Sequence, residues 1–139
     1  MSLPPLVLEG THIRLEPLSP GHLPGLLAVG LAPELWAQTV DKIRTPADLT
    51  RYAERAMQEA ANGLSRPFAT IWRDTGAVIG STRFGNLVPA HRRAEIGWTW
   101  LGVAWQRTAA NTEAKLLMLE HGFERMNLRR IEFKTSLKS

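Results

Sequence analysis

The sequence has 139 residues, which is the length of one domain and enough to bury a core. It has no cysteine, which excludes disulfides, a thiol nucleophile and thiolate-bound metal, and fits a cytoplasmic protein. The net charge of +4 suits an anionic ligand or an ordinary basic surface, and no nucleic-acid motif accompanies it. The sequence also shows no signal peptide and no apolar run long enough to span a membrane.

The first elements in chain order are a strand and two helices. Residues 11–18 alternate between apolar and polar side chains, which is typical of a strand with one buried face. Leucines then recur at helical spacing over residues 23–31. Thr45, followed by Pro-Ala-Asp, is typical of a helix start, and Asn62-Gly63 is typical of a helix end.

The second half of the chain predicts three strands, a helix and a last strand. These elements are expected at residues 67–73, 77–87, 94–101, 112–126 and 129–137. Gly80 and Gly85 lie inside the second of these strands and are candidate sites of β-bulges. The predicted order is therefore β-α-α-β-β-β-α-β.

A short polar loop, residues 106–112, lies between the third of these strands and its helix. The first N–H groups of a helix have no partner within the helix and carry partial positive charge, so such a loop can bind phosphate. Arg107 would add a full positive charge. The alternative is an ordinary helix start, capped by Thr108 or Asn111.

The region around this loop resembles the GNAT acetyltransferase superfamily. Residues 95–98, Glu-Ile-Gly-Trp, resemble a strand common in the branch related to ribosomal-protein N-terminal acetyltransferases. Residues 101–105 resemble the segment that follows, and residues 112–114 resemble the start of the next helix. The resemblance implies one acyl-coenzyme A N-acyltransferase-like domain over residues 1–139. Its expected class is α+β, with a mixed, mostly antiparallel central sheet and helices on both faces.

The sequence departs from the family pattern in two places. The family loop usually carries glycines, whereas this loop has Ala109 and Asn111 at those positions, and glycine allows the closest approach of a backbone to a ligand. The family also continues with a helix and two strands after residues 129–137. The resemblance thus implies a domain that is incomplete at its C-terminus, and we expect a homodimer that covers the exposed edge of the last strand.

The resemblance implies an N-acetyltransferase that moves an acetyl group from acetyl-coenzyme A to a primary amine by direct attack. The acceptor would be a small molecule or a peptide N-terminus. The expected coenzyme-binding residues lie at the end of a strand and in the loop after it: Trp100, Leu101, Gly102, Val103, Gln106, Arg107, Thr108, Ala109, Ala110, Asn111 and Thr112.

Glu95 is the candidate general base, acting directly or through a water, because a partly buried carboxylate on this strand would be a stronger base. The alternative is a salt bridge between Glu95 and Arg92 or Arg93. His91 is the rival base, since an imidazole titrates near neutral pH.

Trp98 and His91 are the candidate walls of the acceptor pocket, although core packing would also explain the tryptophans of this strand. The histidines show no metal-like spacing, so no metal site is expected. The alternative function is a catalytically inactive fragment that acts at most as a coenzyme-binding or interaction module. A nucleic-acid partner is not expected, because only the basic pI favours one.

Overall fold

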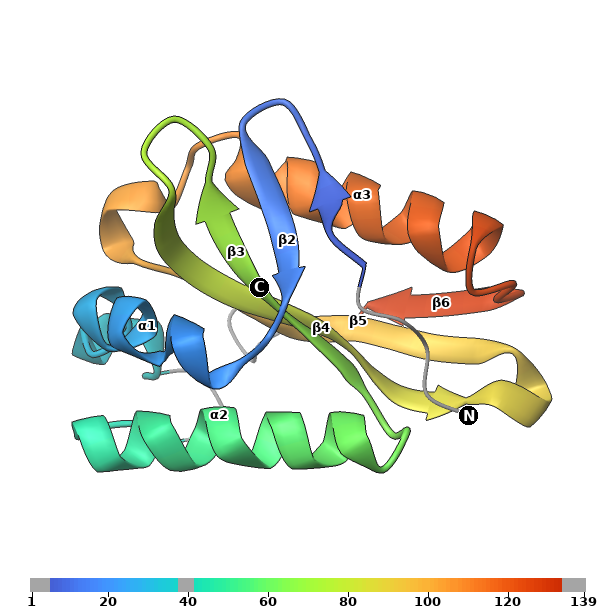
Figure 1. The fold of residues 1–139 in the computed structure, drawn as a ribbon, viewed down its shortest axis with the longest axis horizontal. Helices are drawn as coiled ribbons and strands as arrows, with labels where there is room; N and C mark the ends of the chain where they lie inside the picture. The colour runs from blue at the N-terminus through green and yellow to red at the C-terminus, as the bar shows by residue number, and fades with distance from the viewer. Residues whose placement is uncertain (1–5, 38–41, 134–139) are drawn as a thin grey trace.

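The fold is built on a mixed sheet whose strands lie side by side in chain order. In the computed structural model the described residues are 6–37 and 42–133. The first five strands pair antiparallel, whereas β5 and β6 run parallel and are joined by a helix (Figure 1). The strands are β1 (Leu8–Glu9), β2 (Ile13–Pro17), β3 (Arg66–Trp72), β4 (Ala77–Val88), β5 (Arg93–Leu101) and β6 (Arg130–Phe133).

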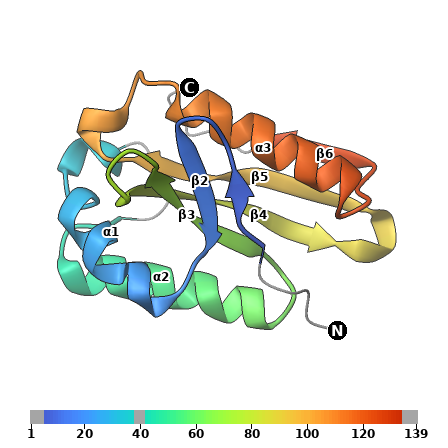
Figure 2. The same ribbon diagram turned by 45° about the horizontal axis from the view of Figure 1, so that its top comes forward.

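Helices cover both faces of this sheet. Helices α1 (Leu23–Val29) and α2 (Pro46–Ala61) lie on one face, and α3 (Ala110–Glu124) lies on the other, as two views of the ribbon show (Figures 1 and 2). Short 3-10 turns fall at Pro20–His22, Pro33–Leu35, Pro89–His91 and Val103–Trp105. The predicted α+β class, with a mostly antiparallel mixed sheet and helices on both faces, is confirmed.

Helix α2 begins and ends where its sequence signals predict. The Thr45 side chain accepts the backbone N–H of Asp48, and the Asp48 carboxylate accepts the backbone N–H of Thr45, each at 3.1 Å. This reciprocal pair satisfies N–H groups that the helix itself leaves open. At the other end Gly63 takes a φ of 76°, which glycine adopts without a steric penalty.

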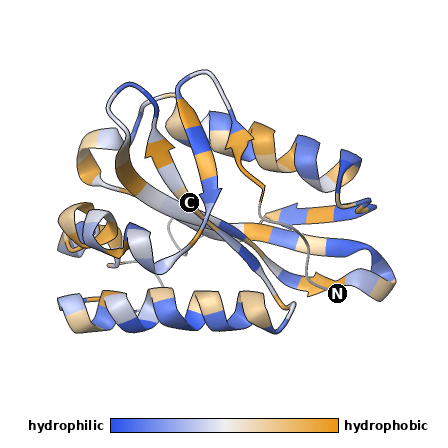
Figure 3. Ribbon diagram, viewed as in Figure 1, coloured by the Kyte–Doolittle hydropathy of each residue, from blue (hydrophilic) through white to orange (hydrophobic). Residues whose placement is uncertain are grey.

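One side of α2 is apolar and packs on the sheet. Leu49, Ala53 and Ala56 are buried and fall on one face at helical spacing. Polar and apolar residues alternate around this helix (Figure 3). The packing creates a core between α1, α2 and the sheet that includes Leu26, Trp36 and Trp100.

Helix α3 packs its small residues against the opposite face of the sheet. Ala110 and Ala114 are buried in its first turns, and Met118 and His121 continue the same face. The small side chains let the start of the helix lie close to the strands. This face closes a second core, which includes Ile13, Phe68, Phe84 and Ile96 among others.

The bounds of several predicted elements change in the structure. The first strand is preceded by the two-residue strand β1, and α3 begins at Ala110 instead of residue 112. Bulges are confirmed beside Gly80 and Gly85, where the pairing register of β4 shifts. The last strand is confirmed over Arg130–Phe133, while the rest of its predicted range lies outside the described residues.

Candidate functional site

The candidate site follows β5 and the loop that leads into α3. The backbone N–H of Gly102 donates to the Ile79 carbonyl at 2.8 Å, which fastens the end of β5 to its neighbour β4. A 3-10 turn over Val103–Trp105 then directs the chain toward α3. The Gln106 side-chain amide donates to the Leu101 carbonyl at 3.3 Å, so the loop is tied back to the strand end.

The turn between this loop and α3 is formed without glycine. Arg107 takes a φ of 65°, in the left-handed region that non-glycine residues rarely occupy. The Thr108 hydroxyl donates to the Trp105 carbonyl at 2.6 Å and accepts the Ala110 N–H at 3.2 Å. The N-cap residue of α3 is Ala109, with no side-chain cap hydrogen bond, so the predicted alternative of a cap by Thr108 or Asn111 is wrong; Thr108 lies one residue before the N-cap, and Asn111 lies inside the first turn.

Several backbone N–H groups of the loop are available to a ligand. Within residues 6–37 and 42–133, the N–H groups of Arg107, Thr108 and Ala109 have no hydrogen-bond acceptor. Ala110 was predicted to bind the coenzyme, but its N–H donates to the Thr108 hydroxyl, and its side chain is fully buried. Three successive open N–H groups at the positive end of a fifteen-residue helix can hold an anion.

The other predicted coenzyme residues divide between surface and core. The side chains of Gln106, Arg107, Asn111 and Thr112 are exposed around the loop, and Val103 is exposed just before it. Leu101 and Gly102 are buried at the strand end. The Trp100 side chain packs in the core, 5.5 Å from Trp36 between ring centroids, so only its backbone is placed to meet a ligand.

Strand β5 carries a bulge where it passes Thr82 of β4. Arg83 pairs with Gly97 and Ser81 pairs with Trp100, so Trp98 and Thr99 together face the single residue Thr82. Trp98 takes a φ of 52°, and the Thr99 hydroxyl lies 2.8 Å from the Thr82 hydroxyl. A bulge locally disrupts the hydrogen-bond ladder and bends the strand that carries it.

Glu95 lies on β5 upstream of the bulge and is half-buried. Its neighbours Ala94 and Ile96 belong to the core under α3, so the Glu95 side chain points to the face that α1 and α2 cover. The Asn86 side-chain amide donates to the Glu95 carboxylate at 2.9 Å. Glu95 and Trp98 are three residues apart on β5, so their Cα atoms are about 10 Å apart along the strand.

The predicted alternative for Glu95, a salt bridge with Arg92 or Arg93, does not form within the described residues. Arg92 instead donates to the backbone carbonyl and the side chain of Asn127, at 2.9 and 2.7 Å. His91 is exposed in the turn before β5, farther from the loop than Glu95.

A cavity of about 310 Å³ lies away from this site. It is lined by residues 6–9 and by the C-terminal half of α3. Among the described residues no three His, Cys, Asp or Glu side chains are grouped to hold a metal ion. None of the helices described here has the length and apolarity that crossing a membrane would require.

The model of the acetyltransferase (GNAT) domain family matches residues 12–138 of this sequence, nearly the whole chain. The chain belongs to the GNAT acetyltransferase family. No curated protein matches the sequence. A solved structure described as an acetyltransferase is 30% identical with a TM-score of 0.83 over 100% of this chain and 69% of that one, so it shares the fold described above.

Three of the similar solved structures are informative. A protein from T. thermophilus, described as an acetyltransferase, is 30% identical with a TM-score of 0.82, and the match covers 100% of this chain and 71% of that one. A GCN5-related N-acetyltransferase from Brucella melitensis is 27% identical with a TM-score of 0.78, covering 91% and 58%. RimL, a ribosomal L7/L12 alpha-N-protein acetyltransferase in complex with coenzyme A, is 17% identical with a TM-score of 0.79, covering 92% and 73%. At that identity RimL supports the fold alone.

Three residues around the site were not predicted as site residues from the sequence, although Glu113 lies in the family-like segment 112–114. Asn86 binds Glu95, Arg83 contacts the Trp98 ring, and Glu113 binds the turn before β2. Asn86 had a local signal, because asparagine beside a strand glycine favours an unusual backbone, and its φ is 47°. Arg83 and Glu113 depend on contacts with residues distant in the chain.

Proposed function

We propose that this chain is an acetyl-coenzyme A-dependent N-acetyltransferase whose acceptor is a primary amine. The observation that carries the proposal is the open row of N–H groups at residues 107–109, in the loop that leads from β5 to the start of α3. These groups suit the pyrophosphate of the coenzyme, and the exposed Arg107 side chain adds a positive charge beside them.

In the proposed reaction the amine nitrogen attacks the carbonyl carbon of the thioester. A C–N bond forms, the C–S bond breaks, and coenzyme A leaves as the thiolate, which then takes up a proton. A bulge locally disrupts the hydrogen-bond ladder of its strand, and we propose that backbone N–H groups at the bulge of β5 stabilise the oxyanion that develops. Glu95 accepts the proton of the attacking amine, directly or through a water, and Asn86 holds its carboxylate in place.

Family membership and the positions of the loop and the carboxylate support this proposal. Peptide N-termini are among the acceptors to test: a free N-terminus is a primary amine, and RimL and a Salmonella typhimurium acetyl transferase that modifies the N-terminal serine of ribosomal protein L7/L12 share the fold. The chain spans 58% to 73% of the length of the compared structures. The acetyltransferase activity of this chain is therefore a proposal that the experiments below test.

The second candidate is a domain that binds the coenzyme without turnover. Ala109 and Asn111 favour this second candidate. Each has a Cβ at a position where the family usually has glycine, and glycine lets the backbone come closer to a ligand. A domain of this kind would bind acetyl-coenzyme A and release no acetylated product.

Calorimetric titration with acetyl-coenzyme A tests the proposal. We expect a dissociation constant on the order of micromolar, and we expect Arg107→Glu to weaken it about tenfold or more. Arg55→Glu is the matched control, because Arg55 is an exposed arginine of α2, on the opposite face from α3, and the change in net charge is the same. Equal losses in both variants would argue for non-specific attraction, and no binding by the folded wild type would refute the proposal.

A screen of amine acceptors then separates the two candidates. Peptides with a free N-terminus, amino sugars, polyamines and small metabolites are incubated with acetyl-coenzyme A, and product is detected by mass spectrometry. Product with any class supports the transferase. Binding without product across all classes supports the coenzyme-binding domain.

We also propose a homodimer that covers the free edge of β6. This strand is at the edge of the described sheet, and Phe133 on it remains 47% exposed. The mass of the protein by light scattering at high concentration tests this, and a monomer would contradict it.

A further inference from the structure

The bulge of β5 has a strained residue at its centre. Trp98 adopts a φ of 52°, and for a bulky side chain this left-handed conformation is an outlier. Such conformations persist only where the surroundings enforce them, and they gather at functional sites. The contacts of the Trp98 ring therefore show what enforces the conformation.

Arg83 of β4 forms one side of the Trp98 environment. Its guanidinium lies 5.1 Å from the Trp98 ring centre and 5.3 Å from the Tyr52 ring centre. Arg83 is only 7% exposed, and one of its terminal nitrogens lies 3.2 Å from the Glu59 carboxylate of α2. A buried, always charged and planar group with a carboxylate partner is held in a fixed orientation, and it stacks on aromatic faces.

Gly85 forms the other side. A Cβ atom at Gly85 would overlap atoms of the Trp98 ring, so the ring occupies the space that a side chain would need. Gly85 is also the Cα partner of Glu95, the candidate base, across the two strands. Arg83 and Gly85 thus confine one ring beside the backbone that carries the bulge.

We propose that Arg83 is a positioning residue for acyl transfer, which holds the Trp98 ring over Gly85 and thereby fixes the β5 bulge in the geometry that receives the thioester. This inference rests on the proposed function. Arg83 itself contacts neither donor nor acceptor; it acts through Trp98. The clamp is the pair of residues Arg83 and Gly85 that confines the Trp98 ring. When the clamp is lost, Trp98 relaxes toward extended backbone, and the N–H groups at the bulge turn away from the oxyanion.

The clamp predicts a particular kinetic signature. The coenzyme is held mainly by the loop at residues 107–109, on the far side of Leu101 from the bulge, so its binding is unaffected. The chemical step slows, because oxyanion stabilisation depends on donors at the correct distance and angle. A purely structural arginine would instead lower stability with no selective effect on the chemical step.

Two variants disturb the clamp from opposite sides. Arg83→Lys retains the charge for Glu59 but loses the planar group that stacks on Trp98. Gly85→Ala leaves Arg83 intact and displaces the ring directly. The matched controls are Arg51→Lys, at an exposed arginine of α2 with its own carboxylate partner, and Gly21→Ala, where the nearest atom to an added Cβ is 3.7 Å away.

Three measurements are made on each protein: the indole N–H resonance of Trp98, the dissociation constant for acetyl-coenzyme A, and kcat for thiol release with a large excess of an amine acceptor. The resonance is assigned as the one that Trp98→Phe removes. We expect both clamp variants to shift it and to lower kcat about tenfold or more, with the dissociation constant changed less than about twofold. We expect both controls to match the wild type.

The outcomes separate this inference from the proposed function. If the wild type binds and transfers but both clamp variants keep the wild-type resonance and kcat, the clamp is refuted and the transferase stands. A shifted resonance with unchanged kcat also refutes the positioning role. If the folded wild type binds no acetyl-coenzyme A, the proposed function fails, and the role of Arg83 in acyl transfer fails with it.

Discussion

Glu113, in the first turn of α3, binds the backbone of His12 and Ile13, which are 101 and 100 residues earlier in the chain. One oxygen of its carboxylate accepts the two N–H groups at 2.7 and 2.9 Å. The contact joins the start of α3 to the turn between β1 and β2. Because the candidate coenzyme loop ends where α3 begins, the same carboxylate helps to hold the loop against the sheet.

Glu113→Ala is expected to destabilise the protein. The change removes two charge-assisted hydrogen bonds and leaves two N–H groups without their acceptor, which together cost about 2 kcal/mol of unfolding free energy. Chemical denaturation measures the change. Glu120→Ala is the control, since Glu120 is exposed on the same helix, and its effect is expected to stay within about 0.5 kcal/mol. Equal effects of the two substitutions would contradict the role assigned to Glu113.

Much of the fold could be predicted because its signals are local. The capping pair of Thr45 and Asp48 and the glycine at 63 mark α2 within a few residues of chain. The position of the loop at residues 106–112 and the place of Glu95 on β5 followed from residue types and from the family resemblance. The assignment of the site residues remains a prediction.

The remaining features depend on partners distant in the sequence. An arginine in an alternating strand is usually exposed, and Arg83 is buried because Tyr52, Trp98 and Glu59 surround it. The earlier start of α3 also has a tertiary cause, since Ala110 fits fully buried against the sheet. Strand β1, with two residues, is too short to produce a periodic pattern.

Glu95→Gln tests the proposed base. The amide cannot accept the proton of the amine, so kcat is expected to fall by about 100-fold, while the affinity for acetyl-coenzyme A is unchanged. Gln keeps a side-chain oxygen to accept from Asn86, so the fold is expected to be retained. Glu132→Gln, at an exposed position of β6, is the control and is expected to behave as the wild type. Undiminished turnover in Glu95→Gln would exclude Glu95 as the base.

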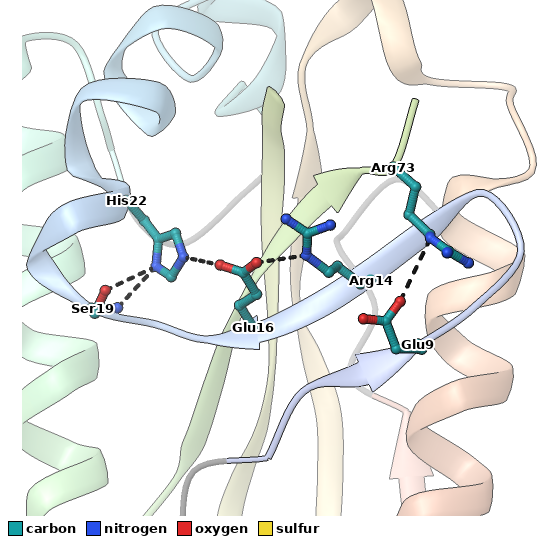
Figure 4. A network of polar contacts seen from close by, with 6 residues as sticks. All are labelled: Glu9, Arg14, Glu16, Ser19, His22 and Arg73. Atoms are coloured by element: carbon teal, nitrogen blue, oxygen red, sulfur yellow. Dashed lines mark hydrogen bonds and ion pairs between the residues drawn. The ribbon is translucent and has the colours of Figure 1, made fainter. Parts of the chain in front are cut away.

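Glu16 of β2, the strand next to the edge strand β1, is the centre of a charged network (Figure 4). Its carboxylate contacts the His22 ring at 2.8 Å and the Arg14 guanidinium at 2.6 Å. The His22 Nδ1 accepts the Ser19 N–H at 3.0 Å, so in neutral His22 the proton lies on Nε2, which donates to Glu16. The hydrogen bonds from His22 and from Arg14 lower the pKa of Glu16.

This lowered pKa predicts acid sensitivity. Above the ordinary carboxyl pKa both the folded and the unfolded state are ionised, and the stabilisation by Glu16 is fully present. As the pH falls below that value the unfolded state takes up the proton first, so stability is lost until the pH passes the folded-state pKa. The unfolding free energy of Glu16→Gln, measured from about pH 7 to about pH 3, should fall less steeply than that of the wild type. Glu54→Gln, at an exposed site of α2, should keep the wild-type slope.

His121 gives a prediction of the opposite kind, because it is a buried polar group whose loss should stabilise the protein. It is 6% exposed, packs 6.2 Å from Phe84 between ring centroids, and neither ring nitrogen has a hydrogen-bond partner among the described residues. Burial lowers the pKa of His121, and the charges of Arg66 on β3 and Arg125 at the end of α3 lower it further. The imidazole is therefore neutral in the folded protein at neutral pH.

His121→Leu replaces this ring with an apolar side chain of similar size. At about pH 7 the variant should be more stable by about 1 kcal/mol, since no unpaired polar atom is then buried. Below about pH 6.5 the unfolded wild type protonates His121 while the folded state does not, so wild-type stability falls with pH until the folded-state pKa is reached. The stability advantage of His121→Leu should therefore widen in this range, whereas His91→Gln, at an exposed histidine, should show no such widening. An advantage that stays constant with pH would mean that His121 is protonated equally in both states.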